Sequence, residues 1–249
     1  MMAAGFFTVG AIVGSFLNVC AWRLPKGRSL WMPGSACPVC ASPIRWYDNI
    51  PVLSFVLLHG QCRDCKGRIA WQYPIVEMGT ASLFALAYLQ IGWRSDLPLA
   101  LLLLSALIVI TAIDLEHQLI PDRITLPGIV AGFAGSALLG RGSWLNSLLG
   151  ILIGGGAFFL IIVLSGGGMG GGDMKLGAML GAFLGWKLLF LGLFLAAFLG
   201  GAVAVALLLA GRKGRKDPLP FGPFLAFGGA ISLFWGEGIL RWYLNGFPG

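Results

Sequence analysis

Long apolar runs alternate with short polar segments along nearly the whole chain, and this alternation is its dominant pattern. A helix needs roughly 20 apolar residues to cross the hydrocarbon core of a bilayer. The runs that approach this length cover residues 3–22, 74–93, 97–115, 124–140, 144–165, 174–188, 189–210 and 221–240. The stretch 176–210 is too long for one span, and Gly185-Trp186-Lys187 is the natural place for a turn within it. The pattern predicts an all-α polytopic membrane protein with about eight transmembrane helices.

Composition supports a membrane location and argues against a nucleic-acid partner. Hydrophobic residues make up 57% of the chain and charged residues only 11%, which is typical of a membrane protein. The net charge is +7, but the basic residues lie in short segments between apolar runs, where they set topology. The first run has no basic residue before it, and Arg23 follows it, so we interpret it as a retained span rather than a cleaved signal peptide.

The basic residues divide unequally between the two sides of the membrane. One side receives thirteen, namely Arg23, Lys26, Arg28, Arg45, Arg63, Lys66, Arg68, Arg123, Lys175, Arg212, Lys213, Arg215 and Lys216. The other side receives four, namely Arg94, Arg141, Lys187 and Arg241. By the positive-inside rule the richer side is cytoplasmic. Both chain ends then face outward, and segment 23–73, Asp114 and Asp173 all lie at the cytoplasmic side.

Segment 23–73 is the only stretch long and polar enough to form a domain outside the membrane. It contains two Cys-x-x-Cys motifs, formed by Cys37 with Cys40 and by Cys62 with Cys65. Such paired motifs can supply four thiolates to a tetrahedral zinc ion, and a complete sulfur set leaves no position for a reactive water. Disulfides are the weaker alternative, because the segment falls on the reducing side of the membrane. We therefore expect structural zinc.

Two aspartates near the ends of apolar helices are the candidate chemical groups. Asp114 ends the run 97–115, and Asp173 follows the glycine-rich run 165–172. A carboxylate at the centre of a membrane helix costs about 2.5–3.5 kcal/mol on insertion scales, so such acids usually face the protein interior and serve function. The glycine run cannot hold a stable helix, since each Gly costs about 1 kcal/mol relative to Ala. Broken backbone at membrane depth is tolerated where it lines a wet cavity, as hydrolysis requires.

Simpler interpretations of these acids stay open. Asp114 can mark the end of its helix at the headgroup level, and the run before Asp173 can be a flexible loop before a helix start. A phosphate-binding loop is disfavoured, because no Gly-Lys-Ser/Thr ending follows and Asp173 repels phosphate. Among the other acids, we expect Asp122 to cap a helix, Glu116 to be solvated, and Glu77 to face a basic group or the helix dipole.

If Asp114 and Asp173 meet, their chemistry is that of an aspartyl-protease dyad. Two adjacent carboxylates cannot both ionise, so one keeps a proton while the other acts as general base on a water between them. His59 and His117 form no zinc-protease signature, and the chain has no nucleophile-elbow motif. The dyad needs no metal, so the predicted zinc stays structural.

The ordered motifs of the chain resemble the bacterial type IV prepilin peptidases, also called prepilin leader peptidases/N-methyltransferases, of the Gly-x-Gly-Asp intramembrane aspartyl-protease class. Besides the two cysteine motifs, the matching pieces are Gly14-Ser-Phe-Leu-Asn-Val-Cys-Ala-Trp-Arg-Leu-Pro25, Asp48-Asn-Ile-Pro51, Tyr73-Pro-Ile-Val-Glu77, Ile113-Asp-Leu115, Ile120-Pro-Asp122, Gly170-Gly-Gly-Asp-Met-Lys-Leu176 and Pro220-Phe-Gly-Pro223. The resemblance puts the catalytic acids at Asp114 and Asp173 and the cysteine tetrad at Cys37, Cys40, Cys62 and Cys65.

The resemblance also implies a substrate, a location and a second activity. Such enzymes lie in the bacterial inner membrane. They remove a short basic leader from type IV pilin or type II secretion pseudopilin precursors, cutting after a Gly, and then methylate the new N-terminus with S-adenosylmethionine. The sequence has no Gly-x-Gly-x-x-Gly nucleotide motif, so we assign no residues to that cofactor. The expected division is a first transmembrane helix (1–22), a cytoplasmic zinc-binding domain (23–73) and a transmembrane aspartyl peptidase domain (74–249).

Two other classes of function stay open. A cation-coupled transporter can also use paired acids, here Asp114 and Asp173, at a broken helix, but it predicts inverted internal repeats, and none is convincing in this sequence. A non-catalytic assembly scaffold can use the zinc module as its docking surface. The scaffold predicts that Cys37→Ser impairs function while Asn variants of both acids remain active.

Overall fold

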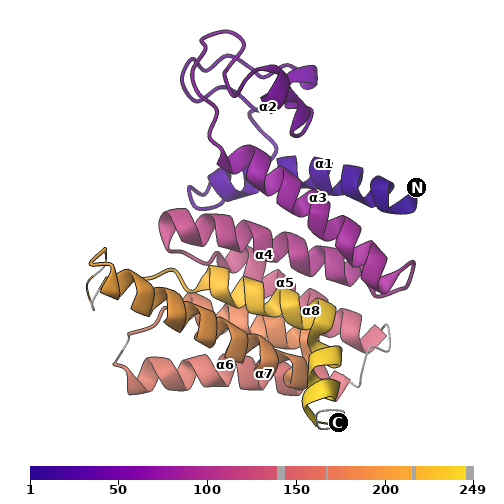
Figure 1. Ribbon diagram of the computed structural model, residues 1–249, viewed down its shortest axis with the longest axis vertical. Helices are drawn as coiled ribbons and strands as arrows, with labels where there is room; N and C mark the ends of the chain where they lie inside the picture. Colours follow the sequence, from indigo (N-terminus) through magenta and orange to yellow (C-terminus); the bar gives the residue numbers. More distant parts are fainter. Residues whose placement is uncertain (139–143, 167, 213, 215–216, 245–249) are drawn as a thin grey trace. The chain divides into compact units, whose positions relative to one another are not determined.

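The computed structural model describes residues 1–138, 144–166, 168–212, 214 and 217–244. Regular structure within these ranges is helical, apart from two isolated β-bridges that join Ala36 to Pro43 and Gln61 to Arg68. The elements, coloured in chain order in Figure 1, are α1 (Met2–Arg23), a short 3-10 helix η1 (Trp46–Asn49), α2 (Leu53–Leu57), α3 (Gln72–Ile91), α4 (Leu97–His117), α5 (Asp122–Leu138), α6 (Trp144–Leu164), α7 (Gly171–Leu209) and α8 (Gly222–Leu244). Four residues of the topology count lie outside the described residues: Arg141, Lys213, Arg215 and Lys216.

The predicted all-α membrane class is confirmed. In the described part of the chain, six helices are long and apolar enough to cross a membrane, namely α1, α3, α4, α6, α7 and α8. The apolar helix α5 is shorter, with 17 residues and Pro127 inside it. The 39-residue α7 is interrupted at Gly185, where φ is 71° and ψ is 170°. Gly185 is the turn that the sequence predicts, and it divides α7 into two arms, 171–184 and 186–209. With several helices long enough to span a bilayer, the chain is a multi-pass membrane protein.

The second arm of α7 runs antiparallel to α8. Its residues Leu188, Gly192 and Gly200 lie in turn against Gly236, Gly228 and Phe224 of α8, so the order of contacts is reversed along the two helices. The first arm contacts the same helix, because the Leu180 side chain lies against Gly229. Helix α8 therefore packs against both arms of the broken helix.

Glycines let the first arm of α7 approach α6 with backbone against backbone. Gly150 and Gly154 of α6 face Gly181 and Gly177 of α7. A Cβ placed on Gly150, Gly154 or Gly181 would overlap the facing backbone, and one placed on Gly177 would overlap the Phe158 ring. Small residues at such spacing allow close packing in membranes, where neighbouring lipid is as apolar as leucine and burial alone does not join helices. This packing fixes the arm that begins beside Asp173.

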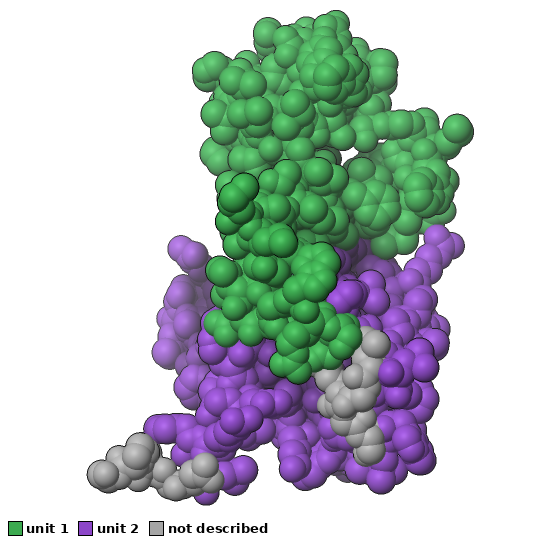
Figure 2. All heavy atoms as spheres, turned by 90° about the vertical axis from the view of Figure 1, so that its right-hand side faces the viewer, with its two compact units in different colours: residues 1–97 green, residues 98–249 purple. Residues whose placement is uncertain are grey.

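The chain divides into two compact units, residues Met1–Leu97 and Pro98–Gly249, coloured separately in Figure 2. In the first unit, α1 and α3 lie side by side, and the segment between them, which contains η1 and α2, extends from one end of the pair (Figure 1). Gly10 and Gly14 of α1 lie against the α3 backbone, since a Cβ on either would be 2.7 Å from the Cα of Ala81 or Glu77. The predicted division at residues 22 and 73 concerns membrane topology and stays a prediction.

Candidate active site and metal centre

Asp114 lies at the end of α4 and is almost fully buried, with 5% of its surface exposed. Its Oδ2 atom accepts a hydrogen bond of 2.8 Å from the backbone N–H of Gly222, the first residue of α8. The first N–H groups of a helix have no partner within that helix, so a carboxylate there satisfies one of them. Asp114 of α4 is thereby hydrogen-bonded to the start of α8. This contact was not predicted from the sequence.

Asp173 occupies the first turn of α7, directly after the glycine-rich run. The helix begins within that run, with Gly170 in extended conformation as its N-cap, and the Asp173 N–H donates to the Gly170 carbonyl at 3.2 Å. Gly172 packs closely on Ile120, because a Cβ there would be 2.8 Å from the Ile120 Cβ. Asp173 itself is half-buried. A run without side chains thus places this carboxylate at the start of an arm that is fixed against α6.

Asp114 and Asp173 are close enough for their carboxylates to interact electrostatically. They come from different helices of the second compact unit, α4 and α7, as the sequence analysis expected. Two acids brought together in a mostly apolar environment are a candidate site for acid–base chemistry. The two acids therefore influence each other within the second unit, and the dyad itself stays a prediction.

An ion pair lies next to this site along the chain. Lys175, two residues after Asp173, places its Nζ atom 2.7 Å from both carboxylate oxygens of Asp122. Asp122 is the first residue of α5, where the sequence predicts a capping residue, but the interaction that the structure gives it is this pair. Lys175 stands out in the sequence as a basic residue and as part of the motif that ends at Leu176, but its pairing with Asp122 could not be predicted from either.

The four predicted cysteine ligands meet in the first compact unit. The sulfurs of Cys37, Cys40, Cys62 and Cys65 all lie within 4.8 Å of one another, and those of Cys37 and Cys65 are 3.8 Å apart. Four sulfurs at about 2.3 Å from a tetrahedral zinc ion are roughly 3.8 Å from each other, so the donor set fits zinc. Among the described residues, no other group of three or more such side chains meets the same condition.

The two halves of this cysteine cluster have the same backbone geometry, offset by twenty-five residues. The first Cys of each pair donates its N–H five residues on, Cys37 to the Ser42 carbonyl at 2.9 Å and Cys62 to the Gly67 carbonyl at 2.8 Å. The residue after each second Cys has positive φ, 58° for Ala41 and 60° for Lys66. Each β-bridge joins the residues that flank one of these turns. Two equal knuckles therefore hold the sulfurs.

The cysteine thiols influence one another strongly. Hydrogen bonds from Ser42 lower the pKa of Cys40 to about 6. The Gly67 amide acts to lower the pKa of Cys65, but desolvation and hydrogen bonds with the other three thiols raise it to about 12. This spread is expected when one thiolate is stabilised by neighbouring S–H donors while the last proton is hard to remove. A divalent cation at the centre would replace those protons.

Two buried charged residues of the first unit organise the segment between α1 and α3. Arg23 ends α1 and donates to four backbone carbonyls, those of Ser29, Leu30, Pro33 and Gly34. Glu77 in α3, 8% exposed, accepts the backbone N–H of Val52 at 2.7 Å, rather than facing a basic group. Neither role can be read from the sequence, because the printed partners of Arg23 and Glu77 are backbone groups.

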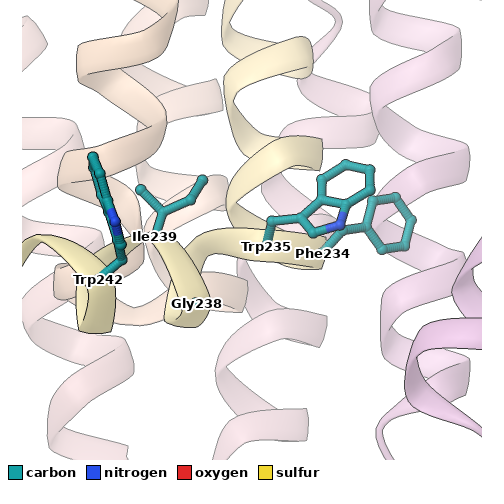
Figure 3. A pocket seen from close by; sticks show the side chains of 5 residues that line it. All are labelled: Phe234, Trp235, Gly238, Ile239 and Trp242. Carbon is teal, nitrogen blue, oxygen red and sulfur yellow. The ribbon is translucent and has the colours of Figure 1, made fainter. Parts of the chain in front are cut away.

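A shallow hollow of about 370 Å³ lies on α8 and contains none of these groups. Its lining consists of Phe234, Trp235, Gly238, Ile239 and Trp242 (Figure 3). Gly238 is roughly 24 Å along the helix axis from Gly222 at 1.5 Å per residue. Aromatic residues near a helix end are typical of the membrane interface, so we do not assign the hollow to the acid pair.

Comparison with known proteins gives two family-model matches, one in each compact unit. A model described as Bacterial Peptidase A24 N-terminal domain matches residues 8–91, and one described as Type IV leader peptidase family matches residues 101–205. Comparison with solved structures gave no match.

Curated proteins named prepilin leader peptidase/N-methyltransferase are similar over most of the chain. The protein from Bacillus subtilis (strain 168) is 36% identical over 247 residues, which cover 98% of each chain. The one from Aeromonas hydrophila is 37% identical over 272 residues, covering 97% of this chain and 93% of the relative. The one from Myxococcus xanthus (strain DK1622) is 39% identical over 223 residues, covering 88% of this chain and 66% of the relative.

Proposed function

Because this chain belongs to the prepilin leader peptidase/N-methyltransferase family, we propose that it is a membrane-embedded aspartyl endopeptidase acting on type IV prepilins or type II secretion pseudopilins. It removes their basic leader after a Gly and then methylates the new N-terminal residue. The observation that supports the peptidase assignment is the electrostatic interaction between Asp114 and Asp173, which come from two helices of the second unit. The family membership confirms the resemblance that the sequence motifs indicate.

In this proposal Asp114 and Asp173 share one proton and one water molecule. The ionised acid takes a proton from the water, whose oxygen forms a bond to the carbonyl carbon of the scissile peptide. The protonated acid gives its proton to the carbonyl oxygen. When the tetrahedral intermediate collapses, the carbon–nitrogen bond breaks and the leaving amine receives a proton from the dyad.

The site is proposed to open to the cytoplasmic face of the bacterial inner membrane. The excess of Lys and Arg on that side supports this orientation through the positive-inside rule. A precursor whose basic leader stays in the cytosol would present the junction between leader and apolar helix at this level. The ends of α4 and α7, which carry Asp114 and Asp173, are then at the depth where that junction lies.

We propose that Cys37, Cys40, Cys62 and Cys65 hold a structural zinc ion. A Zn²⁺ ion with four thiolates stabilises the fold of the segment that carries them and has no open position for water. The knuckles provide this set within a segment that has few buried apolar side chains. The cysteine centre supplies structure in this proposal, and the aspartates supply the chemistry.

The methylation step follows from the family name, and its methyl donor would be S-adenosylmethionine. We assign no residue of this chain to that cofactor. Two acids of the first unit, Glu77 and Asp48, have partners in the protein: Glu77 accepts the Val52 amide, and Asp48 accepts two hydrogen bonds from the Arg63 guanidinium.

The proposal is tested with purified protein and a short pilin-like precursor. We expect Asp114→Asn and Asp173→Asn each to abolish removal of the leader, while the matched variant Asp122→Asn, whose acid is half-exposed and outside the dyad, retains it. Mass spectrometry of the product distinguishes a cut after Gly from cuts elsewhere and reports N-methylation. Processing that survives either dyad substitution would rule out the dyad and favour the transporter, which cation uptake into proteoliposomes would then test.

A further inference from the structure

We propose that the start of α8 is a positioning element of the peptidase site and that it acts on Asp114 through the Gly222 amide. This inference rests on the proposed function, because it matters only if Asp114 takes part in the chemistry. The amide donates to the Asp114 Oδ2 atom at 2.8 Å, and both residues are buried. One carboxylate oxygen of Asp114 is thereby fixed by a backbone donor.

A side chain at this position would displace the Asp114 carboxylate. A Cβ on residue 222 would be 2.7 Å from the Asp114 Oδ2 atom, 3.1 Å from its Cγ and 3.3 Å from its Cβ. Real Cβ atoms do not approach oxygen that closely, so any other side chain would push the carboxylate away from the amide. Helix formation does not favour a glycine here, since a glycine inside a helix weakens it by about 1 kcal/mol relative to alanine. The glycine instead allows the close approach of Gly222 to Asp114.

The surrounding contacts fix the direction of the amide. Pro220 and Pro223 flank the position and restrict the backbone at the helix start. The Phe221 ring packs edge-on against Phe158 of α6, with centroids 6.2 Å apart, and Leu225 one turn later is fully buried. The donor is therefore held in place before any substrate binds, which is the condition for a preorganised electrostatic contact.

Helix α8 also connects the elements that carry the two acids. Gly222 contacts Asp114 at the end of α4, while Gly229 lies against Leu180 of the α7 arm that begins near Asp173. Helix α8 therefore contacts Asp114 itself and also the arm that carries Asp173. A shift of α8 would change the separation of the two acids. This relation explains why the donor is on α8 rather than on a loop between the acids.

The amide also affects the charge of the site. A helix N-terminus carries roughly half a positive charge, and an amide donating to a carboxylate favours the ionised form. Besides Asp114, the charged or titratable groups of the adjoining elements are Asp173, Lys175 and Lys187 on α7, Asp122 and Arg123 on α5, and Glu116 and His117 at the end of α4. Helix α8 itself has no charged residue before Glu237. Its contribution to Asp114 is therefore made by the backbone.

The sharpest test replaces the Phe221–Gly222 amide by an ester, which removes the N–H and adds no atoms. We expect kcat for precursor cleavage to fall on the order of 10- to 100-fold, the loss that corresponds to one hydrogen bond to a charged group, with KM little changed. The acidic limb of the pH–rate profile should move to higher pH, because the carboxylate pair loses a group that stabilises its anionic form.

The matched control places the same ester at Phe224. Its N–H donates to the Phe221 carbonyl at 3.1 Å, so the change loosens the same helix start without touching Asp114. We expect wild-type kcat and an unshifted pH profile. An ester at Gly222 that leaves kcat and the acidic limb as in the wild type, or a Phe224 ester that reproduces the effect, would overturn the proposal.

A second pair of variants covers the case in which the Gly222 ester does not fold. Gly222→Ala places a methyl group against the carboxylate, and Gly236→Ala places one 2.7 Å from the Leu188 Cδ2 atom, fourteen residues further along α8 and away from both acids. We expect the first to lose at least 10-fold in kcat and the second to stay within about threefold, consistent with the difference between a charged contact and apolar packing. Wild-type cleavage by Gly222→Ala overturns the positioning role alone. Cleavage by Asp114→Asn instead overturns the proposed function.

Discussion

Lys175 holds its Nζ atom 2.7 Å from both carboxylate oxygens of Asp122, and this ion pair connects the first turn of α7 to the first residue of α5. The two side chains are 32% and 53% exposed, so water screens their attraction. Exposed pairs typically contribute 0.2–1 kcal/mol. The pair therefore orients two helix starts and adds little to stability.

We expect Lys175→Met and Asp122→Asn each to lower the free energy of unfolding by less than about 1 kcal/mol, and the double variant to lose less than the sum. Leader removal should persist in all three. Thermal unfolding in detergent and the cleavage assay measure these effects. A loss of cleavage as complete as that of Asp173→Asn would show instead that Asp122 or Lys175 takes part in the chemistry.

The close approach of α6 and α7 predicts a sharp difference between glycines of one region. Gly181→Ala puts a Cβ into the Gly150 backbone and should lower stability by about 1–3 kcal/mol or prevent folding, as overpacking does. Gly156→Ala, in the same helix as Gly150, meets nothing within 4 Å and should be neutral or stabilise by up to about 1 kcal/mol. Equal melting temperatures for the two variants would contradict this packing.

Much of the architecture could be predicted from the sequence because a membrane span is a local signal. The apolar runs predicted α1, α3 and α4 within three residues at each end. The turn at Gly185 followed from the length of the stretch 176–210, which is too long for one span. The cysteine spacing likewise predicted a cluster, because each knuckle is a local turn. Predicting the spans and the cysteine cluster did not require knowledge of which helices are neighbours.

The contacts between distant helices could not be predicted in the same way. The hydrogen bond from Gly222 to Asp114 joins residues 108 apart in sequence, and its donor is a backbone group that no residue type reveals. A helix that is apolar all round shows no face that identifies its neighbour. The Pro220–Pro223 motif was visible, but its spacing indicates only a helix start, and the tertiary structure shows what that start contacts.

Removal of zinc should separate structure from catalysis. We expect purified protein to contain about one zinc per chain, and Cys37→Ser to lose it, because four thiolates are needed to complete a structural site. Proteolysis should then cut within residues 24–71 much faster. Cleavage of the precursor should fall less than about 10-fold, since neither aspartate is a ligand of the centre.

Cys20→Ser is the control for that experiment, because Cys20 is buried in α1 and does not belong to the cysteine cluster. It should keep its zinc by elemental analysis and resist proteolysis like the wild type. Complete loss of cleavage on chelation, with the membrane helices still folded by circular dichroism, would contradict a purely structural metal.

The Asp48–Arg63 pair predicts how the cysteine-bearing segment responds to acid. The Arg63 guanidinium, 2.6 Å from Asp48 at its nearest, lowers the pKa of that carboxyl below its usual range. A lowered folded-state pKa adds stability that is fully present above the unfolded value of about 3.9 and is lost as pH falls through the folded value. The stability difference between wild type and Asp48→Asn should therefore be constant near neutral pH and shrink below about pH 3.9. A difference that grows on acidification would exclude the pair as its source.

Glu77 and Val52 form the contact that holds the extended segment against α3. Val52 has φ 60° and ψ −47°, and the Leu53 N–H donates to the Pro51 carbonyl at 2.6 Å, which makes a γ-turn with positive φ. This turn is rare and strained, and a β-branched residue is especially unfavourable there. The buried Glu77 carboxylate stabilises it by accepting the Val52 N–H.

Loss of that acceptor should release the turn. We expect Glu77→Ala to destabilise the first unit by about 1–3 kcal/mol, because the buried amide is left without its partner. Glu77→Gln keeps an oxygen acceptor and should lose less. Val52→Gly removes the strain and should recover part of the stability in the Glu77→Ala background. Hydrogen exchange of residues 48–57 reports the opening directly, and equal protection in the wild type and Glu77→Ala would show that the strained turn is held by other contacts.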